Sequence, residues 1–197
     1  AGQSYQNVAD PSIYITFPLI DKPNVNLIAW TTTPWTLPSN LALCVHPTFD
    51  YVQFKCKEKG NEYIVCKDLL EKVTKDIHIK EYEVISTFKG TDLKGTKYTP
   101  LFNDFSKYLD DQKCYRVLND EYVTKSDGTG IVHQAPAFGE DDFRICVKEG
   151  IVDQDSPLCP IDDDGNFTNE FKLTSGMNFK EADPIIIDNL KSRGRLL

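Results

Sequence analysis

Several motifs common in enzymes are missing from this sequence. It contains no Gly-x-Ser-x-Gly elbow, no glycine-rich phosphate loop and no His-Glu-x-x-His pair. Its three histidines, at positions 46, 78 and 133, are scattered, which disfavours a zinc site. The aspartates before Gly165 lack calcium-loop spacing and predict a hairpin turn around Asp164-Gly165. We therefore expect no metal and no cofactor. If the chain is an enzyme, its nucleophile should be water positioned by hydroxyls and a carboxylate.

Paired cysteines and targeting signals are also absent. The six cysteines form no Cys-x-x-Cys pair, and most lie in apolar surroundings. An even number permits disulfides, but reduced, mostly buried thiols are the better interpretation. No apolar run is long enough for a membrane span, and the start "AGQSYQNVADPS" does not resemble a signal peptide. These absences favour a cytoplasmic protein without a membrane partner.

Positive charge is in short supply. Lysine and arginine total 22 against 30 acidic residues, giving a net charge of −8. This balance argues against a protein that coats nucleic acid, because such binding depends on basic side chains at phosphates. It does not exclude a domain that touches only the end of a nucleic acid. The length of 197 residues predicts a single domain.

Strands dominate the pattern along the chain. Short apolar or alternating runs predict strands at 12–17, 25–30, 51–56, 62–66, 81–88, 114–118 and 129–135. Helical spacing predicts helices over 67–76 and 139–150, and a last helix with Pro184 at its first position and Gly194 after its end. The expected fold is mixed α/β and β-rich, with a central β-barrel-like core and peripheral helices.

The stretch "AWTTTPWTLPSNLA", residues 29–42, gathers threonines beside an aromatic residue. A helix is disfavoured because β-branched residues and two prolines fit its interior poorly. A central strand is disfavoured because proline removes ladder hydrogen bonds. The stretch should therefore leave a strand and form a fixed, irregular loop that presents hydroxyls. Such a loop is either a simple turn or the wall of a polar pocket.

A second stretch, "DGTGIVHQAPAFGEDDFRIC", covers residues 127–146. It predicts a short strand that ends near His133, a loop, and a helix that begins with acidic residues. Each feature also has a structural interpretation. His133 alone is more often a hydrogen-bonded core residue, and Asp141 and Asp142 suit the positive end of any helix dipole. Trp30 and Trp35 are more often core residues than pocket residues.

Together, "WTTTPWTLPSN" and "GTGIVHQAPAFGEDD" resemble the editing domain of class I isoleucyl-tRNA synthetases, the connective-peptide insertion in their catalytic core. Leucyl and valyl relatives usually have Thr-Thr-Arg-Pro in the first motif, whereas this chain has Thr32-Thr33-Pro34-Trp35. "DPSIYITF" and "KSRGRLL" resemble the borders of the insertion in eukaryotic cytosolic enzymes. The ATP-binding signatures of the synthetases are missing, so no aminoacylation is expected. The resemblance implies a single editing domain, residues 1–197, excised from a longer synthetase.

The resemblance also implies a reaction and roles for residues. The reaction would be hydrolysis of valine from mischarged valyl-tRNA(Ile), at the terminal adenosine of the tRNA. Thr31, Thr32 and Thr33 would supply hydroxyls to the substrate and the attacking water, and Asp142 would hold the α-ammonium of valine. The residues implied to line the substrate pocket are Trp35, Thr36, His133, Ala135 and Phe138. The implied partners are this tRNA end and the rest of the parent synthetase, with the isolated domain a monomer.

Two other hypotheses remain open. The chain could be a module that docks the 3′ end of tRNA without catalysis, as a degenerate editing domain would. It could also be a free-standing ester hydrolase, although no nucleophile motif supports that interpretation. Release of valine from valyl-tRNA(Ile) would separate an editing enzyme from a binding module.

Overall fold

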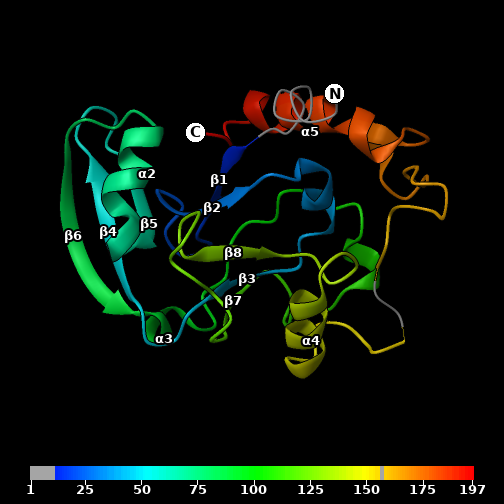
Figure 1. The fold of residues 1–197 in the computed structure, drawn as a ribbon, viewed down its shortest axis with the longest axis horizontal. Coiled ribbons are helices and arrows are strands. Elements are labelled where there is room, and N and C mark those ends of the chain that lie inside the picture. Colours follow the sequence, from blue (N-terminus) through cyan, green and yellow to red (C-terminus); the bar gives the residue numbers. More distant parts are fainter. Residues whose placement is uncertain (1–11, 156–157) are drawn as a thin grey trace.

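Two β-sheets with helices around them make up the computed structural model, which describes residues 12–155 and 158–197 (Figure 1). The larger sheet is ordered β1 (Ile13–Pro18), β2 (Val25–Thr31), β5 (Glu62–Cys66), β4 (Asp50–Cys56) and β6 (Tyr82–Lys89). The smaller is ordered β7 (Val117–Asn119), β3 (Ala42–Val45) and β8 (Ile131–Gln134). β2 pairs with β5 in parallel and β3 with β7 in parallel, while the other neighbours are antiparallel. The expected mixed α/β, strand-rich fold is thus confirmed.

The two sheets touch but do not merge. Thr129, just before β8, donates its hydroxyl to the carbonyl of Ile28 in β2 at 2.6 Å, and its own carbonyl accepts from the amide of Cys66 at 2.8 Å. These bonds join the sheets near one end. The strand ladders of the described residues form two open sheets and no closed barrel, so the expected barrel-like core is not confirmed. Local strand patterns could not decide this, because closure depends on which distant strands pair.

Most predicted strands are present, with two differences. The run 114–118 contributes only the three-residue strand β7. β3 (Ala42–Val45) was not predicted, because its four residues are all buried and show no alternation. Both faces of β3 are covered, which explains why the alternating pattern is missing. Asp10 and Pro11, part of the predicted border segment, lie outside the described residues, as does most of the polar start.

The predicted helices are present, but one begins earlier than expected. The helical run 67–76 forms η2 (Lys67–Leu69) and α2 (Leu70–Asp76), and α4 (Glu140–Lys148) is followed by Gly150 with a φ of 72°. The last helix, α5 (Phe179–Ser192), contains Pro184 in its interior, so the prediction of a start at Pro184 is wrong. The side chain of Asn178 accepts from the amide of Lys180 at 3.1 Å and sets the true start.

Short helices complete the chain: η1 (Pro34–Ser39), α3 (Gly90–Leu93), η3 (Ser106–Tyr108) and η4 (Lys172–Thr174). None of the helices in the described ranges is long and apolar enough to cross a membrane. All six cysteines are free thiols, five of them buried and Cys159 exposed, as the composition predicted.

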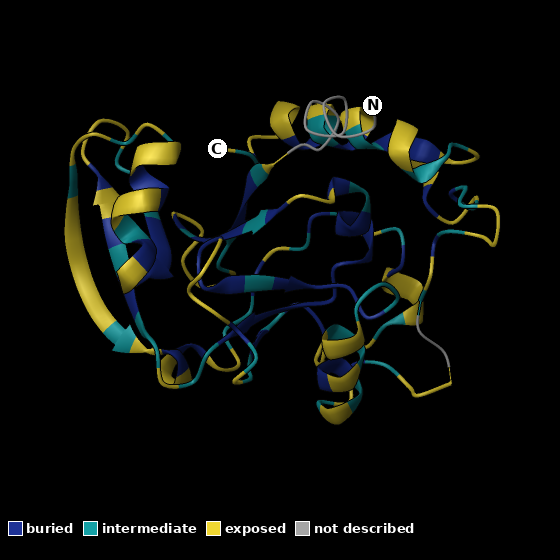
Figure 2. Ribbon diagram, viewed as in Figure 1, coloured by how far each residue is buried: buried dark blue, intermediate teal, exposed yellow. Residues whose placement is uncertain are grey.

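One strand, β6, is far more exposed than the other strands (Figure 2). The strands of the smaller sheet are almost entirely buried, whereas β6, at the edge of the larger one, is mostly exposed. Tyr51 and Tyr98 are the largest side chains that are fully buried. The phenol of Tyr51 donates to the carbonyl of Gly130 at 2.6 Å and so ties β4 to the turn before β8. The segment that leads into β8 is therefore held by buried contacts on several sides.

Candidate functional site

The threonine-rich stretch leaves β2 at Thr31 and forms η1 (Pro34–Ser39), not an irregular loop. That part of the prediction is wrong. A 3₁₀ turn is short and tolerates Pro34 at its first position, where no amide donor is needed. The other part is correct, because the turn is fixed by its own hydroxyls. Thr36 donates its hydroxyl and its amide to the carbonyl of Thr33, at 2.9 and 3.0 Å.

A row of hydroxyls runs along this turn. The Oγ1 of Thr31 accepts from the amide of Thr33 at 3.0 Å and lies 3.3 Å from the Oγ1 of Thr33. The Oγ1 of Thr33 lies 3.5 Å from that of Thr36. Thr31 and Thr36 are buried, whereas Thr32 and Thr33 are exposed. The row therefore runs between the protein interior and the surface, where a ligand could meet Thr32 and Thr33.

His133 joins the two motifs. Its Nε2 lies 3.0 Å from the Oγ1 of Thr36, a residue 97 positions earlier in the chain. Its Nδ1 lies 2.9 Å from the Nδ2 of Asn40. β8 pairs antiparallel with β3, which places His133 opposite Leu43, just past the threonine-rich turn. The sheet register therefore brings the two separate motifs to one place.

The hydrogen-bond network assigns the tautomer of His133. The side-chain amide of Asn40 donates to the carbonyl of Ala42 at 2.9 Å, and its Oδ1 accepts from the hydroxyl of Tyr98. Asn40 therefore presents a donor to His133, whose Nδ1 accepts, and the ring proton sits on Nε2 and points at Thr36. Burial lowers the pKa of His133 to about 4, so the ring is neutral at physiological pH. Since both nitrogens are occupied, His133 is no free general base.

Asp142 lies in the first turn of α4, half-buried. Its Oδ2 accepts from the amide of Ala135 at 2.9 Å, which closes the loop between β8 and α4. A Cβ on Gly139 would lie 2.7 Å from the Cγ of Asp142, so the chain needs glycine there. Burial is the main cause that raises the pKa of Asp142, and the charge of Asp141 adds to it. A carboxylate in this setting gains from a cationic partner.

Asp141 lies in a different setting, although it is adjacent in sequence. It is exposed, and its Oδ1 lies 3.2 Å from the guanidinium of Arg144. Asp142 instead contacts the backbone just after His133. The structure therefore favours Asp142 over Asp141 as the acid beside the two motifs.

Aromatic side chains form a second cluster beside the threonine-rich turn. Trp35 packs edge-on against Phe138, with ring centroids 4.9 Å apart, and against Phe179 of α5 at 4.7 Å. Ala135, which lies between His133 and Phe138 in the sequence, is buried. Trp35 and Phe138, both predicted to line a pocket, thus contact one another across the two motifs, and α5 supplies a third ring that was not predicted.

Two negative findings bear on the site. Among residues 12–155 and 158–197, no group of three or more His, Cys, Asp or Glu side chains is placed to hold a metal. The carboxylate of Asp162 accepts from the amides of Asp164 and Asn166, so the aspartate run forms the predicted turn.

A hollow of about 660 Å³ lies elsewhere, between the segment 99–104, η4 and α5, and none of the predicted residues lines it. We place the site by its converging polar groups and not by that hollow.

Three contributors were missed by sequence reasoning. Asn40 lies inside the quoted first motif, so its position was visible but its contact with His133 was not. Tyr98 and Phe179 carry no local signal, because they reach the site from distant segments. Their roles depend on tertiary packing.

A comparison of sequences finds relatives that match this chain over its full length. No protein-family model matches the chain. The cytoplasmic isoleucine–tRNA ligase of Caenorhabditis elegans is 46% identical over 198 residues, which cover 100% of this chain and 17% of the ligase. The mouse cytoplasmic enzyme is 47% identical, with 100% of this chain and 16% of the ligase covered. The chain thus spans about a sixth of the length of these relatives.

Solved structures share the fold at low identity. The cytosolic leucyl-tRNA synthetase editing domain of P. knowlesi aligns with a TM-score of 0.68 and 10% identity, over 94% of both chains. The corresponding domain of P. falciparum aligns with a TM-score of 0.65 and 13% identity, over 88% of this chain and 78% of that one. This similarity carries the fold alone.

Proposed function

The chain is homologous over its whole length to one segment of the cytoplasmic isoleucine–tRNA ligases and has the fold of leucyl-tRNA synthetase editing domains, and from this premise we propose that it is a hydrolytic editing domain. Residues 1–197 would form a single domain of a longer class I synthetase. Its reaction is hydrolysis of the ester in valyl-tRNA(Ile). This fragment has no aminoacylation activity of its own in this proposal.

One observation carries the proposal. The hydrogen bond between Thr36 and His133 joins the two motifs that the resemblance singles out. Asp142 is tied to the same strand end through the amide of Ala135. Hydroxyls, a neutral imidazole and a carboxylate are thus all bonded to or near the end of β8, and these are the groups that an aminoacyl ester needs.

The roles follow from this chemistry. Water attacks the ester carbonyl, the bond to the ribose oxygen breaks, and free valine and the tRNA hydroxyl are released. Thr31, Thr32 and Thr33 position the water and the terminal ribose without adding charge. The carboxylate of Asp142 holds the α-ammonium through a charge-assisted hydrogen bond. Because His133 is neutral and bonded at both nitrogens, it does not take up the proton. One proton of the attacking water passes, with the help of the free ribose hydroxyl, to the leaving ribose oxygen. The other is lost to solvent as valine leaves with a carboxylate group.

Selectivity rests on the walls of the pocket. A binding pocket separates valine from isoleucine by only about 1–3 kcal/mol for the extra methylene, and isoleucyl-tRNA synthetase is itself the standard example of this limit. A second site must therefore exclude isoleucine by steric clash. Trp35, Thr36, His133, Ala135 and Phe138 are the proposed walls. The contacts of Trp35 with Phe138 and Phe179 make one wall stiff, and stiff packing makes a clash costly.

Partners and location complete the proposal. The partners are the 3′-terminal adenosine of tRNA(Ile) carrying valine and the rest of the parent synthetase. The net charge of −8 predicts weak tRNA binding by the isolated chain, which should be monomeric. The names of the relatives support a cytoplasmic location. No cofactor takes part.

The test is direct. The 197-residue chain and the whole synthetase that contains it are incubated with preformed valyl-tRNA(Ile) and, separately, with isoleucyl-tRNA(Ile). The expected result is release of valine, with isoleucine largely retained on its tRNA. Binding of both tRNAs without release of either amino acid would instead support the docking module. Release of both at equal rates would favour an unselective ester hydrolase.

A further inference from the structure

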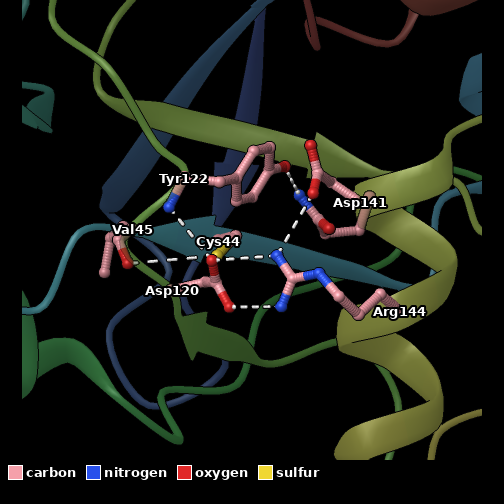
Figure 3. A network of polar contacts seen from close by, with 7 residues as sticks. Cys44, Val45, Asp120, Tyr122, Asp141 and Arg144 are labelled. Carbon is pink, nitrogen blue, oxygen red and sulfur yellow. Dashed lines mark hydrogen bonds and ion pairs between the residues drawn. The ribbon is translucent and has the colours of Figure 1, made fainter.

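Arg144 follows Asp142 by two residues in α4, and Figure 3 shows its guanidinium between Asp120 and Asp141. From α4, its guanidinium reaches Asp120, which follows β7, in a forked pair: one nitrogen lies 3.1 Å from Oδ2 and the other 3.2 Å from Oδ1. The second nitrogen also lies 3.2 Å from the Oδ1 of Asp141, one helical turn earlier. One arginine therefore joins two acids, one on its own helix and one on the smaller sheet.

Asp120 is firmly attached to that sheet. Its amide donates to the carbonyl of Val45 at the end of β3, at 3.1 Å, and its Oδ1 accepts from the amide of Tyr122 at 3.0 Å. The hydroxyl of Tyr122 in turn accepts from the side-chain amide of Gln134 at 2.6 Å. Gln134 follows His133 in β8. This series of hydrogen bonds, from Arg144 through Asp120 and Tyr122 to Gln134, thus fixes the first half of α4 against β8, the strand that carries His133.

The same arginine governs the charge beside Asp142. Asp141 is the charged group that raises the pKa of Asp142 next to burial. The charge of Asp142 also acts on Cys44 of β3, Tyr122 after β7 and Cys146 of α4, and Glu140 is a further acid in the first turn of α4. Burial raises the pKa of the two thiols and of the phenol, so these three groups are neutral at physiological pH. Arg144 pairs with Asp141 at 3.2 Å, so its positive charge lies next to the carboxylate whose charge raises the pKa of Asp142.

We propose that Arg144, acting with Asp120, is a positioning residue for editing: it holds the first turn of α4 so that Asp142 faces the substrate ammonium, and it pairs Asp141 so that Asp142 stays ionised. Arg144 touches no substrate. The inference rests on the proposed function, since it assigns the residue that orients the ammonium-binding carboxylate of the same site.

The kinetics of the folded enzyme separate this role from ordinary stabilisation. The side chain of Arg144 is 51% exposed, against 12% for Asp120. Loss of Arg144 leaves a mostly buried carboxylate without its cation, so some loss of stability is expected in either case. A positioning role raises KM and moves the pH profile. A merely structural role lowers the fraction of folded enzyme, and hence kcat, with KM and the profile unchanged.

The experiment compares variants of the whole synthetase in deacylation of valyl-tRNA(Ile) between pH 5 and 8. In Arg144→Gln we expect kcat/KM to fall roughly tenfold, mainly through KM, because a displaced carboxylate binds the ammonium less well. The acidic limb of the profile should also move to higher pH. Lys148→Gln is the matched control, because it removes an equal charge from the exposed surface of the same helix.

Two further variants separate the two halves of the role. Arg144→Lys keeps the positive charge but not the fork, so it should keep the wild-type acidic limb while KM rises. Asp141→Asn combined with Arg144→Gln should restore the acidic limb without restoring KM. An Arg144→Gln profile that matches Lys148→Gln overturns the proposal, and so does a double variant whose acidic limb remains shifted. Failure of the proposed function is distinguishable, because the wild-type synthetase would then release no valine.

Discussion

His133 and Asp142 belong to one short segment, but burial suits the bonds of His133 and opposes the charge of Asp142. Burial favours the neutral form of both, lowering the pKa of His133 to about 4 and raising that of Asp142. For His133 the neutral ring is what its neighbours need, because Asn40 donates to one nitrogen and Thr36 receives the proton of the other. For Asp142 burial opposes the charge that an ammonium requires.

This difference teaches how the two halves of the site should work. The half around His133 is neutral and fully hydrogen-bonded, so it suits a rigid wall that senses shape. The half around Asp142 is half-buried and charged, so it suits recognition of a cation. Substitutions in the first half should change stability and selectivity, whereas those in the second should change binding of the aminoacyl group.

The largest effect is expected from His133→Ala. The change leaves a buried space and removes the partner of Asn40 and Thr36, which should lower the free energy of unfolding by about 3–5 kcal/mol. Denaturant unfolding of the chain measures this loss. If His133 is also the size-limiting wall, the variant synthetase should begin to hydrolyse isoleucyl-tRNA(Ile).

Hydrolysis of valyl- and isoleucyl-tRNA(Ile) is therefore measured side by side for this variant. An unchanged ratio would mean that His133 is only a structural hydrogen-bonding residue, and Thr36 would become the next candidate for the wall. Thr36→Val is the matching variant, since it removes the hydroxyl and nearly keeps the shape.

Asp142→Ala should come next in size. Loss of a charged hydrogen bond of about 1.5–3 kcal/mol should slow deacylation of valyl-tRNA(Ile) by about 10- to 160-fold. Asp142→Asn tests the charge alone, because the amide oxygen can still accept from Ala135. Asp141→Ala is the control. If that control is inactive and Asp142→Ala is near normal, the assignment moves by one residue.

Acidification should weaken the half around His133 in particular. Its folded pKa of about 4 lies below the usual 6.5, so the unfolded chain binds the proton first. The contribution of neutral His133 to the free energy of unfolding is therefore complete above pH 6.5 and declines as the pH falls towards 4, with a loss of about 2 kcal/mol at pH 5. Unfolding is measured at pH 7 and 5 for the wild type and for His133→Gln. Equal losses in both proteins would show that His133 is not the source.

The smallest effect, none at all, is expected from metal removal. Both halves of the proposed site use hydroxyls, an amide, an imidazole and a carboxylate, without a metal. Deacylation by the synthetase should therefore be unchanged after treatment with a chelator and after addition of zinc. Activity lost on chelation and regained with zinc would contradict the water-positioning mechanism.

The sequence by itself determined the local elements that have strong local signals. Alternating runs identified most strands, and the acidic start and Gly150 marked α4 correctly. The sequence also singled out Thr36 and His133, which the structure joins. Local rules gave a wrong helix start for α5 and a wrong conformation for the residues after Thr33. Asn178 starts α5 before Pro184, and a 3₁₀ turn accommodates the two prolines after Thr33.

Only the tertiary structure decided how distant segments meet. The register of β3 against β8 places Asn40 on His133, and the packing of Tyr98 orients that asparagine. The sheets remain two open layers because closure depends on pairings between strands far apart in the chain. The link from Arg144 through Asp120 to β3 likewise joins segments that no short window of sequence contains. Side-chain periodicity reports which face of an element is buried, but not which other element buries it.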